Sequence, residues 1–336
     1  MQALNFPPQN WQLSLKNLIT DPKELFAILD LPKELLPAAE RASTLFDLRV
    51  PREFVALMRK GDPKDPLLAQ VLPLEQEFEE RSGFIEDPLN EAASRPTAGV
   101  VHKYKDRVLL ILSGACAINC RYCFRRHFPY SDNQISGTAR EQALTYIRSN
   151  SDIKEVILSG GDPLVASDTR LEQLINDLAA IPHIERLRVH TRLPVVIPSR
   201  ITDRLLEILG KTRLQTALVL HINHSREIST ELERACQQMR QAGVTLLNQA
   251  VILRNVNDQA AIQVELSRSL YRIGILPYYL FLFDPVKGAS HFDIAESDAK
   301  TLAAQMQSEL PGYLMPRLAK EIPNRPSKTL ILPDIQ

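Results

Sequence analysis

Short apolar runs alternate with amphipathic stretches along most of the chain. From residue 108 onward, runs rich in Val, Ile and Leu predict strands that are buried on both faces, as the strands of a parallel sheet are. These runs are 108–112, 155–159, 186–191, 216–222, 245–253 and 276–282. Apolar residues at helical spacing predict five helices between them, over 139–150, 168–180, 199–209, 230–242 and 258–273.

Six parallel strands joined by five helices predict an α/β fold, an open, partial (β/α)6 barrel over residues 96–295. Functional residues are then expected just after the strands, at their C-terminal ends. Residues 1–95 show proline-punctuated helical segments and no strand pattern, which predicts an N-terminal helical accessory domain. Residues 296–336 predict one more helix, over 296–310, and a proline-rich, extended segment that crosses the mouth of the barrel.

Composition and charge narrow the class of protein. The 336 residues contain 40 Lys and Arg against 40 Asp and Glu, without a long run of like charges, so neither nucleic acid nor an anionic membrane surface is expected as a partner. No apolar run approaches the roughly 20 residues that span a bilayer. The N-terminus lacks the basic and apolar regions of a secretory leader. We therefore expect a cytoplasmic protein with no membrane contact.

Three of the four cysteines lie within eight residues, directly after the first predicted strand. Cys116, Cys120 and Cys123 can thus bring three thiolates together from one loop. Cubane iron–sulfur clusters normally take four cysteine ligands, so three would leave one iron open to another ligand. A zinc site with His127 as a further ligand, or a coincidental grouping, is the alternative. Cys236 lies in a helical pattern and is expected to be a small buried apolar residue.

The Cys-x3-Cys-x2-Cys spacing after the first strand of a partial barrel resembles the signature of radical S-adenosylmethionine enzymes. The resemblance implies a [4Fe–4S] cluster whose open iron chelates S-adenosylmethionine, which is cleaved reductively to a 5′-deoxyadenosyl radical. Gly160, Gly161 and Asp162 end the second predicted strand and resemble the glycine-rich segment that lies near the methionyl amino group. Glycine suits such a position because a missing Cβ permits close approach to a ligand.

Flanking motifs resemble the lysine 2,3-aminomutase family, and the resemblance runs from about residue 45 to residue 330. It implies pyridoxal 5′-phosphate as a further cofactor and migration of an α-amino group to the β-carbon, with the cofactors carrying the difficult chemistry. The motifs that carry it are Asp87-Pro-Leu-Asn-Glu91, Val101-His-Lys-Tyr104-Lys-Asp-Arg107, Cys123-Phe-Arg125-Arg126, His190-Thr-Arg192-Leu-Pro-Val-Val-Ile-Pro, His221-Ile-Asn-His224 and Leu247-Asn-Gln249-Ala-Val.

The resemblance also implies which residues hold the cofactors. Lys328 matches the Schiff-base lysine, although Pro323-Asn-Arg-Pro-Ser replaces the glycines that precede it in the family. Tyr104 matches the residue that packs on the pyridoxal ring, Arg107 could reach the phosphate, and Gln249 is expected among the cofactor-binding residues.

The implied substrate residues are Arg125, Asp284 and Glu321. A planar guanidinium at Arg125 can hold the substrate carboxylate bidentately. Asp284 matches the aspartate that pairs with the ε-ammonium of lysine. Glu321 stands seven residues before Lys328, where the family has a second aspartate, so the charge is kept but the reach is longer.

The chain resembles the short bacterial form that supplies (R)-β-lysine for modification of elongation factor P, because the catabolic lysine aminomutases carry a C-terminal extension with zinc-binding cysteines that is not expected here. This implies L-lysine as substrate, a flavodoxin- or ferredoxin-type electron donor, and a functional link to elongation factor P and its β-lysine ligase; a homodimer is one candidate for the oligomeric state. A catabolic lysine aminomutase, or an aminomutase for another amino acid, remains an alternative. So does a different class of protein, an iron–sulfur or zinc module that docks a partner.

Overall fold

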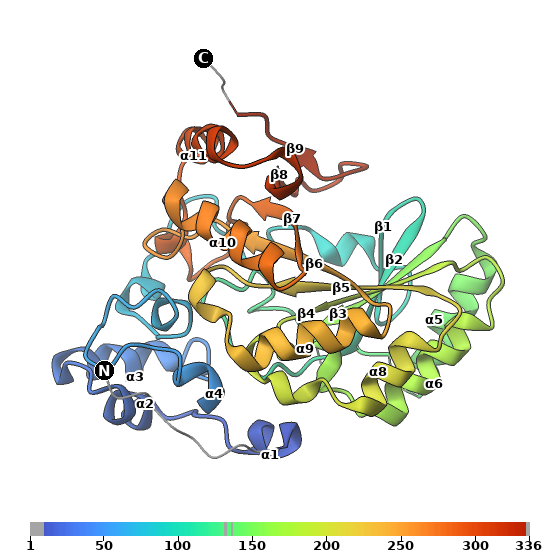
Figure 1. The fold of residues 1–336 in the computed structure, drawn as a ribbon, viewed down its shortest axis with the longest axis horizontal. Helices are drawn as coiled ribbons and strands as arrows, with labels where there is room; N and C mark the ends of the chain where they lie inside the picture. The colour runs from blue at the N-terminus through green and yellow to red at the C-terminus, as the bar shows by residue number, and fades with distance from the viewer. Residues whose placement is uncertain (1–9, 131–132, 136, 334–336) are drawn as a thin grey trace.

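A computed structural model describes residues 10–130, 133–135 and 137–333 (Figure 1). Residues 1–9, on which the expected absence of a leader mostly rests, lie outside this part. The N-terminal region is helical, with short 3₁₀ turns at Leu68–Gln70, Glu75–Phe78 and Glu91–Ser94 among others. Its α-helices are α1 (Trp11–Lys16), α2 (Pro22–Leu29), α3 (Leu36–Ser43) and α4 (Arg52–Val55). No helix in the described ranges is long and apolar enough to cross a membrane.

A single open sheet of nine strands follows, with the strands in chain order from β1 to β9. Strands β2 to β8 are mutually parallel, and β1 and β9 are antiparallel to their neighbours at the two ends. The strands are β1 (Val100–Tyr104), β2 (Arg107–Ser113), β3 (Glu155–Gly160), β4 (Arg186–Thr191), β5 (Gln215–His221), β6 (Thr245–Val251), β7 (Leu276–Phe281), β8 (Arg317–Lys320) and β9 (Thr329–Leu330). The predicted partial barrel is confirmed.

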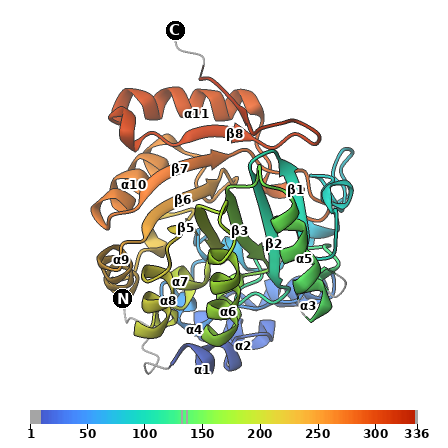
Figure 2. The same cartoon turned by 90° about the vertical axis from the view of Figure 1, so that its right-hand side faces the viewer.

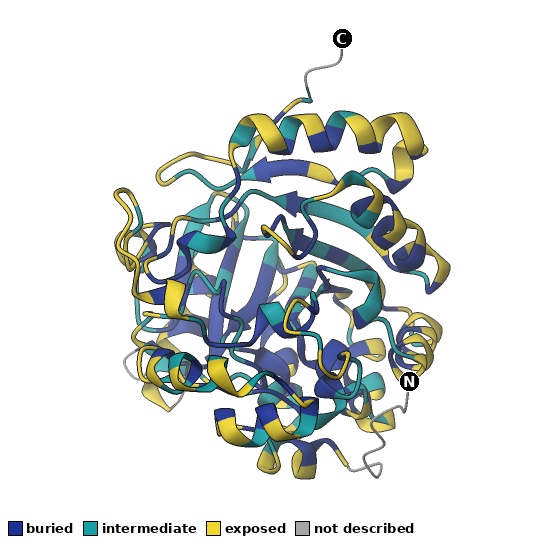
Figure 3. Cartoon of the chain, turned by 90° about the vertical axis from the view of Figure 1, so that its left-hand side faces the viewer, coloured by how far each residue is buried: buried dark blue, intermediate teal, exposed yellow. Residues whose placement is uncertain are grey.

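Helices cover the outer face of the curved sheet (Figure 2). They are α5 (Thr138–Ser149), α6 (Asp168–Ala179), α8 (Asp203–Gly210), α9 (Thr230–Gln241), α10 (Ala260–Arg272) and α11 (Glu296–Glu309), with the short α7 (Leu193–Val196) after β4. Hydroxyl caps set three of their starts: Ser167, Thr202 and Ser229 each accept a hydrogen bond from a backbone N–H of the first turn of α6, α8 and α9. The helices expose their outward faces, and the strands differ in burial: β2 and β3 are mostly buried, whereas most of β7 is only partly buried (Figure 3).

The six predicted strands correspond to β2–β7, but the parallel sheet contains one strand more than predicted. This strand, β8, pairs with β7 through Tyr279 and Arg317. Only four residues long and preceded by prolines, it carries no periodic signal of its own and was expected as part of an extended tail. The helix predicted from residue 199 begins instead at Asp203, because Thr202 provides the cap and residues 198–200 form a 3₁₀ turn.

The N-terminal helices pack against the barrel and share its hydrophobic core. Buried residues such as Phe54, Leu67 and Val71 belong to the same apolar cluster as Leu110 of β2 and Leu158 of β3. The division into residues 1–95, 96–295 and 296–336 stays a prediction. The shared core shows that the segment before β1 packs against the barrel, including Ala117 and Ile118 of the loop that follows β2.

Candidate functional site

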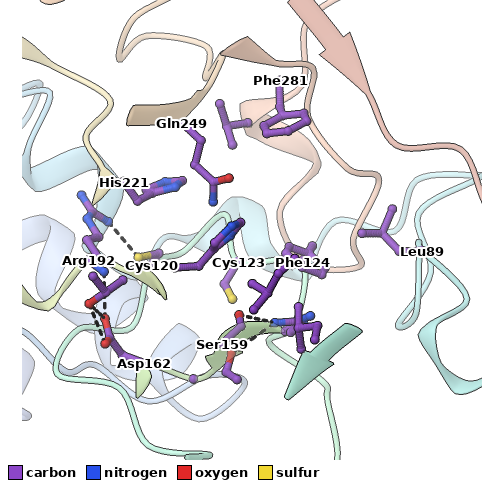
Figure 4. A pocket seen from close by; sticks show the side chains of 18 of the residues that line it. Leu89, Cys120, Cys123, Phe124, Ser159, Asp162, Arg192, His221, Gln249 and Phe281 are labelled. Atoms are coloured by element: carbon purple, nitrogen blue, oxygen red, sulfur yellow. Dashed lines mark hydrogen bonds between the residues drawn. The ribbon is translucent and has the colours of Figure 1, made fainter. Parts of the chain in front are cut away.

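A cavity of about 1280 Å³ lies inside the curved sheet, lined by its parallel strands, the loop after β2 and the end of the tail (Figure 4). All of the residues that were predicted to bind the cluster, the cofactors or the substrate line this one cavity. They come from segments more than 200 residues apart, between Tyr104 and Lys328. Gln249, from β6, projects into the middle of the cavity.

The three predicted cluster cysteines lie half-buried at one end of this cavity. Burial raises the pKa of the Cys116 thiol well above its usual range and that of Cys123 to about 11, and the neighbouring thiols add to both shifts. Thiols in such surroundings ionise readily only when a nearby cation offsets the desolvation, which is what an iron centre supplies. The donor set therefore fits an iron–sulfur cluster bound by Cys116, Cys120 and Cys123.

The zinc alternative finds little support in the surroundings of the cysteines. The ring of His127 lies against the carbonyl oxygen of Lys287, 3.1 Å away, and does not line the cavity. Among the described residues, no three or more His, Cys, Asp and Glu side chains, the three cysteines included, are arranged to hold a single metal ion. Cys236 is fully buried on α9 within the hydrophobic core, as expected, and burial raises its pKa to about 12.

Residues before β1 hold the cysteine loop from beneath. The Arg49 guanidinium donates to the carbonyl oxygen of Cys116 at 3.1 Å, and the Arg121 backbone N–H donates to the carbonyl oxygen of Gln70 at 2.9 Å. Glu77 accepts from Arg121 at 2.5 and 2.8 Å and from Arg126 at 2.7 Å, with all three side chains buried. The loop is thereby fixed on both sides of Cys123.

Gly160 and Gly161 allow the end of β3 to pack against the cysteine loop. Gly160 has φ +125°, and a Cβ there would lie 2.3 Å from the carbonyl oxygen of Ser113. A Cβ on Gly161 would lie 2.5 Å from the carbonyl oxygen of Ala115. Only glycine fits either position, and the clash that it avoids is with the protein's own backbone. Their approach to a ligand stays a prediction.

Asp162 ties the end of β3 to the end of β4. Its carboxylate accepts from the Thr191 hydroxyl at 2.7 Å and from the backbone N–H groups of Arg192 and Leu193 at 2.8 and 2.9 Å. Burial raises the pKa of Asp162, although these hydrogen bonds oppose the shift. The side chain thus has a structural task that the sequence did not reveal, and its expected part in cofactor binding remains untested.

Lys328 lies at the opposite end of the cavity, just before β9. Its ammonium nitrogen is 5.7 Å from the ring centre of Tyr104, 6.0 Å from that of Tyr279 and 5.2 Å from that of Phe281. The Arg107 guanidinium stacks 4.3 Å from the ring centre of Tyr104. A lysine among aromatic rings, with an arginine beside them, offers a planar cofactor an amine, a stacking partner and a cation for a phosphate.

Arg125 lies between the two ends and forms an ion pair with Glu91, a residue for which the sequence predicted no role. Glu91 accepts from Arg125 Nε at 2.7 Å and from Nη2 at 2.8 Å, while Ser159 accepts from Nη1 at 3.1 Å. The bidentate bond to Glu91 uses one edge of the guanidinium. Nη1 also donates to the carbonyl oxygen of Gly160 at 3.4 Å, so one N–H, on Nη2, stays available to a substrate carboxylate.

A chain of alternating charges runs from Arg125 to Lys328. Lys103 lies 3.7 Å from Glu91 and 3.0 Å from Glu321, and Lys328 lies 2.8 Å from Glu321. Burial opposes ionisation of Glu321, but Lys328 and Lys103 outweigh it and lower its pKa to about 2. Glu91 and Lys103 both stand within the motifs quoted above, yet their chemistry could not be assigned without knowing which side chains meet.

Asp284 faces the same cavity from the loop after β7. Desolvation and the nearby Glu321 raise its pKa to about 7, against the lowering influence of Lys328 and Lys103. Among the described residues, no hydrogen bond or ion pair of its carboxylate is found. An anion in this position is suited to an incoming ammonium group, which would lower its pKa.

Comparisons with known proteins place these features in a family. Residues 110–264 match the model of the radical SAM superfamily. The chain is 50% identical over 322 residues to the L-lysine 2,3-aminomutase of Haemophilus influenzae, covering 96% of this chain and 95% of that protein. It is 47% identical to the L-lysine 2,3-aminomutase of Escherichia coli over 97% of this chain and 96% of that protein. The Clostridium subterminale enzyme of the same name is 35% identical, with 97% and 78% covered.

Proposed function

Because this chain belongs to the L-lysine 2,3-aminomutase family of the radical SAM superfamily, we propose that it isomerises L-lysine to β-lysine by moving the α-amino group to the β-carbon. The observation that supports this most is the shared cavity, which has three cysteines at one end and Lys328 among aromatic rings at the other. Arg125 and Asp284 lie along the same space. One small substrate could therefore reach both cofactor sites at once.

The cysteine end is proposed to hold a [4Fe–4S] cluster through Cys116, Cys120 and Cys123, with S-adenosylmethionine on the open iron. When bound, these groups supply the radical that removes a hydrogen atom from the substrate. The chain itself fixes the geometry, because the loop that carries the cysteines is anchored by Glu77 and the ends of β3 and β4 are joined by Asp162.

The opposite end is proposed to hold pyridoxal 5′-phosphate through the amine of Lys328. When bound, this cofactor supplies the carbonyl that carries the migrating amino group. Tyr104 would pack on the pyridine ring, and Arg107, stacked on Tyr104, would face the phosphate. Glu321 holds the Lys328 ammonium in place at 2.8 Å, which is a different task from the contact with the substrate ammonium that the sequence suggested.

Substrate selection is proposed to rest on two charges. Arg125 would bind the α-carboxylate through its remaining Nη2 N–H, while Glu91 keeps the guanidinium plane fixed. Asp284 would accept the ε-ammonium of lysine. Glutamate is disfavoured as a substrate, because its side-chain carboxylate would meet Asp284 and Glu321.

The cellular role is proposed from similarity to the short bacterial forms. Identity is higher to the Haemophilus influenzae protein, at 50%, than to the Clostridium subterminale protein, at 35%. We propose that the product serves modification of elongation factor P by its β-lysine ligase in the cytoplasm, with a flavodoxin- or ferredoxin-type electron donor. Deleting this chain from its host should remove the β-lysyl mass increment from elongation factor P, and an unchanged mass would contradict the role.

The activity is tested by anaerobic reconstitution of the full chain with iron, sulfide, pyridoxal phosphate, reductant and S-adenosylmethionine. Product analysis against a panel of amino acids should find β-lysine from lysine and little from the others. Conversion of another amino acid in preference to lysine would contradict the substrate assignment.

The cysteine ligands are tested separately by iron content. Each of Cys116→Ala, Cys120→Ala and Cys123→Ala should lose the iron and the cleavage of S-adenosylmethionine. Cys236→Ala is the matched control and should keep both, because Cys236 lies in the core on α9. Loss of the cluster in the Cys236 variant would overturn the three-ligand assignment.

A further inference from the structure

A buried arginine from the end of β4 contacts the middle cysteine of the loop. Nη1 of Arg192 lies 2.8 Å from the sulfur of Cys120, and Figure 4 shows the two side chains meeting at the edge of the cavity. Arg192 is only 6% exposed. Its backbone N–H donates to Asp162 at 2.8 Å, so the start of the side chain is fixed as well as its tip.

The rest of the guanidinium is held by a buried polar network that has no part in the proposed chemistry. Nη2 donates to Gln70 Oε1 at 2.7 Å and to Glu227 Oε2 at 2.9 Å, and Nη1 also donates to the Tyr122 hydroxyl at 2.7 Å. Glu227 in turn accepts from the backbone N–H of Asn223 at 2.9 Å, which fixes its own orientation. Arg192 therefore cannot turn away from Cys120 without breaking several buried hydrogen bonds.

The other arginines of this region use their N–H groups elsewhere. Arg125 donates to Glu91, and Arg126 donates to Glu77 and to the carbonyl oxygen of Gly288. Of these three arginines, Arg192 is the one whose N–H contacts a cysteine sulfur, and the buried network holds it in that position.

We propose that Arg192 is a positioning residue of the iron–sulfur cluster, which orients the Cys120 thiolate and makes the cluster easier to reduce. Reduction adds one negative charge to the cluster and its thiolates. A buried cation that donates an N–H to one of these sulfurs stabilises the added charge, and hydrogen bonds to cluster sulfurs are among the factors that set reduction potentials. The inference rests on the cluster assignment proposed above.

Through this network, residues that do not line the cavity would influence the reduction potential of the cluster. Gln70 belongs to the helical segment before β1, and Glu227 to the 3₁₀ turn after β5. Both meet at the same guanidinium. The segment before β1 thus acts on the cluster through Arg192 as well as through the backbone of the cysteine loop.

The test is an anaerobic redox titration, followed by electron paramagnetic resonance, on the full-length reconstituted chain with its iron counted. Arg192→Gln removes the charge and most of the donors. At a fixed applied potential, the ratio of reduced to oxidised cluster should fall about tenfold, which corresponds to roughly 59 mV for one electron. Arg192→Lys keeps the charge, but one ammonium cannot reach Cys120, Gln70 and Glu227 together, so a smaller fall is expected.

Arg188→Gln is the matched control. Arg188 lies on β4, four residues before Arg192, and lines the same cavity, but its guanidinium donates to Glu155 at 2.7 Å. Its loss should move the ratio far less than the loss of Arg192, because it measures only the effect of removing a more distant charge.

Full iron content with an unchanged ratio in Arg192→Gln would overturn the inference, as would an equal fall in Arg188→Gln. If Arg192→Gln binds no iron, Arg192→Lys decides: a lowered ratio supports the role and a wild-type ratio overturns it. If the wild-type chain itself takes up no cluster, the proposed function fails together with this inference, and the two failures are thereby told apart.

Discussion

At the cysteine end of the cavity charged side chains pair with one another inside the protein, whereas at the Lys328 end they face the cavity or the solvent. Arg121 and Glu77 are both 0% exposed, while Lys328 and Glu321 are 23% and 18% exposed. The cysteine loop is bound by residues from before β1, and Lys328 is carried by a tail that ends in the two-residue strand β9.

The difference between the two ends matches what each would have to do. A metal cluster needs thiolates in a fixed arrangement, and buried ion pairs lose much free energy when one partner is removed. A cofactor that accepts and releases substrate needs side chains that can change partners. The ion pair of Lys320 with Glu296 is exposed and correspondingly weak, and that of Lys328 with Glu321 is partly exposed.

The largest expected effect comes from breaking the buried pair beneath the cysteine loop. Glu77→Gln leaves Arg121 and Arg126 without their counter-charge, and breaking a buried ion pair typically costs about 3–5 kcal/mol. We expect a large fall in the free energy of unfolding in urea, together with reduced iron content. Glu296→Gln is the control at the other end, where the pair with Lys320 is exposed and a change of about 1 kcal/mol or less is expected. Equal losses in the free energy of unfolding in both variants would contradict the proposed difference between the two ends of the cavity.

Next in size is the effect of Asp284→Asn on lysine turnover. An ammonium left without its anion in a buried site costs about 3–5 kcal/mol, which corresponds to a loss of roughly 150- to 5,000-fold in kcat/KM. Iron and pyridoxal content should be retained, because Asp284 contacts neither proposed attachment point. The measurement is steady-state kinetics with both cofactors quantified. Normal turnover would show that the ε-ammonium is bound elsewhere.

A pH dependence should accompany the same residue. Because the pKa of Asp284 is raised to about 7, its carboxyl is largely protonated below that pH and cannot pair with an ammonium. We expect kcat/KM for lysine to rise with pH through about 7, with a tenfold fall per pH unit on the acid side. The fall of kcat/KM on the acid side of the pH profile should disappear in Asp284→Asn. A fall that persists in the variant would assign the titration to another group.

The smallest effect is expected from Glu321→Gln. The amide can still accept a hydrogen bond from Lys103 or Lys328, and Glu321 is shared between these two lysines. We expect a fall in kcat of about tenfold or less, because the amide keeps a hydrogen bond to one lysine and Glu321 is not proposed to touch the reacting atoms. A loss as large as that of Asp284→Asn would mean that Glu321 binds the substrate directly, as the sequence suggested.

Strands and helices with a clear period could be predicted from the sequence, and contacts between distant side chains could not. The run at 186–191 predicts β4 to the residue, because its alternate residues Leu187, Val189 and Thr191 are buried, and such a period of two is typical of a strand with one buried face. By contrast, β8 and β9 have too few residues for a period to show. They form because β7 and then β8 offer an edge with which to pair.

The residues of the site likewise divide into those that a local sequence pattern indicates and those that only the fold brings together. The cysteine spacing identifies a ligand loop because the three residues are neighbours in sequence. The bonds of Glu91 to Arg125 and of Arg192 to Cys120 span 34 and 72 residues, so no local pattern could indicate them. The contact of Glu321 with Lys328 at 2.8 Å was likewise not indicated by the sequence, and the expected part of Glu321 in substrate binding stays a prediction.

The central claim is that a cluster and a lysine-bound pyridoxal cofactor occupy two ends of one cavity, and borohydride reduction with peptide mapping tests it most directly. The reconstituted protein, with its iron counted, is treated with borohydride, digested and searched for the phosphopyridoxyl group. The account predicts a label on Lys328 in protein that holds its cluster, and the loss of that label without loss of iron in Lys328→Ala. A label on any other lysine would contradict it.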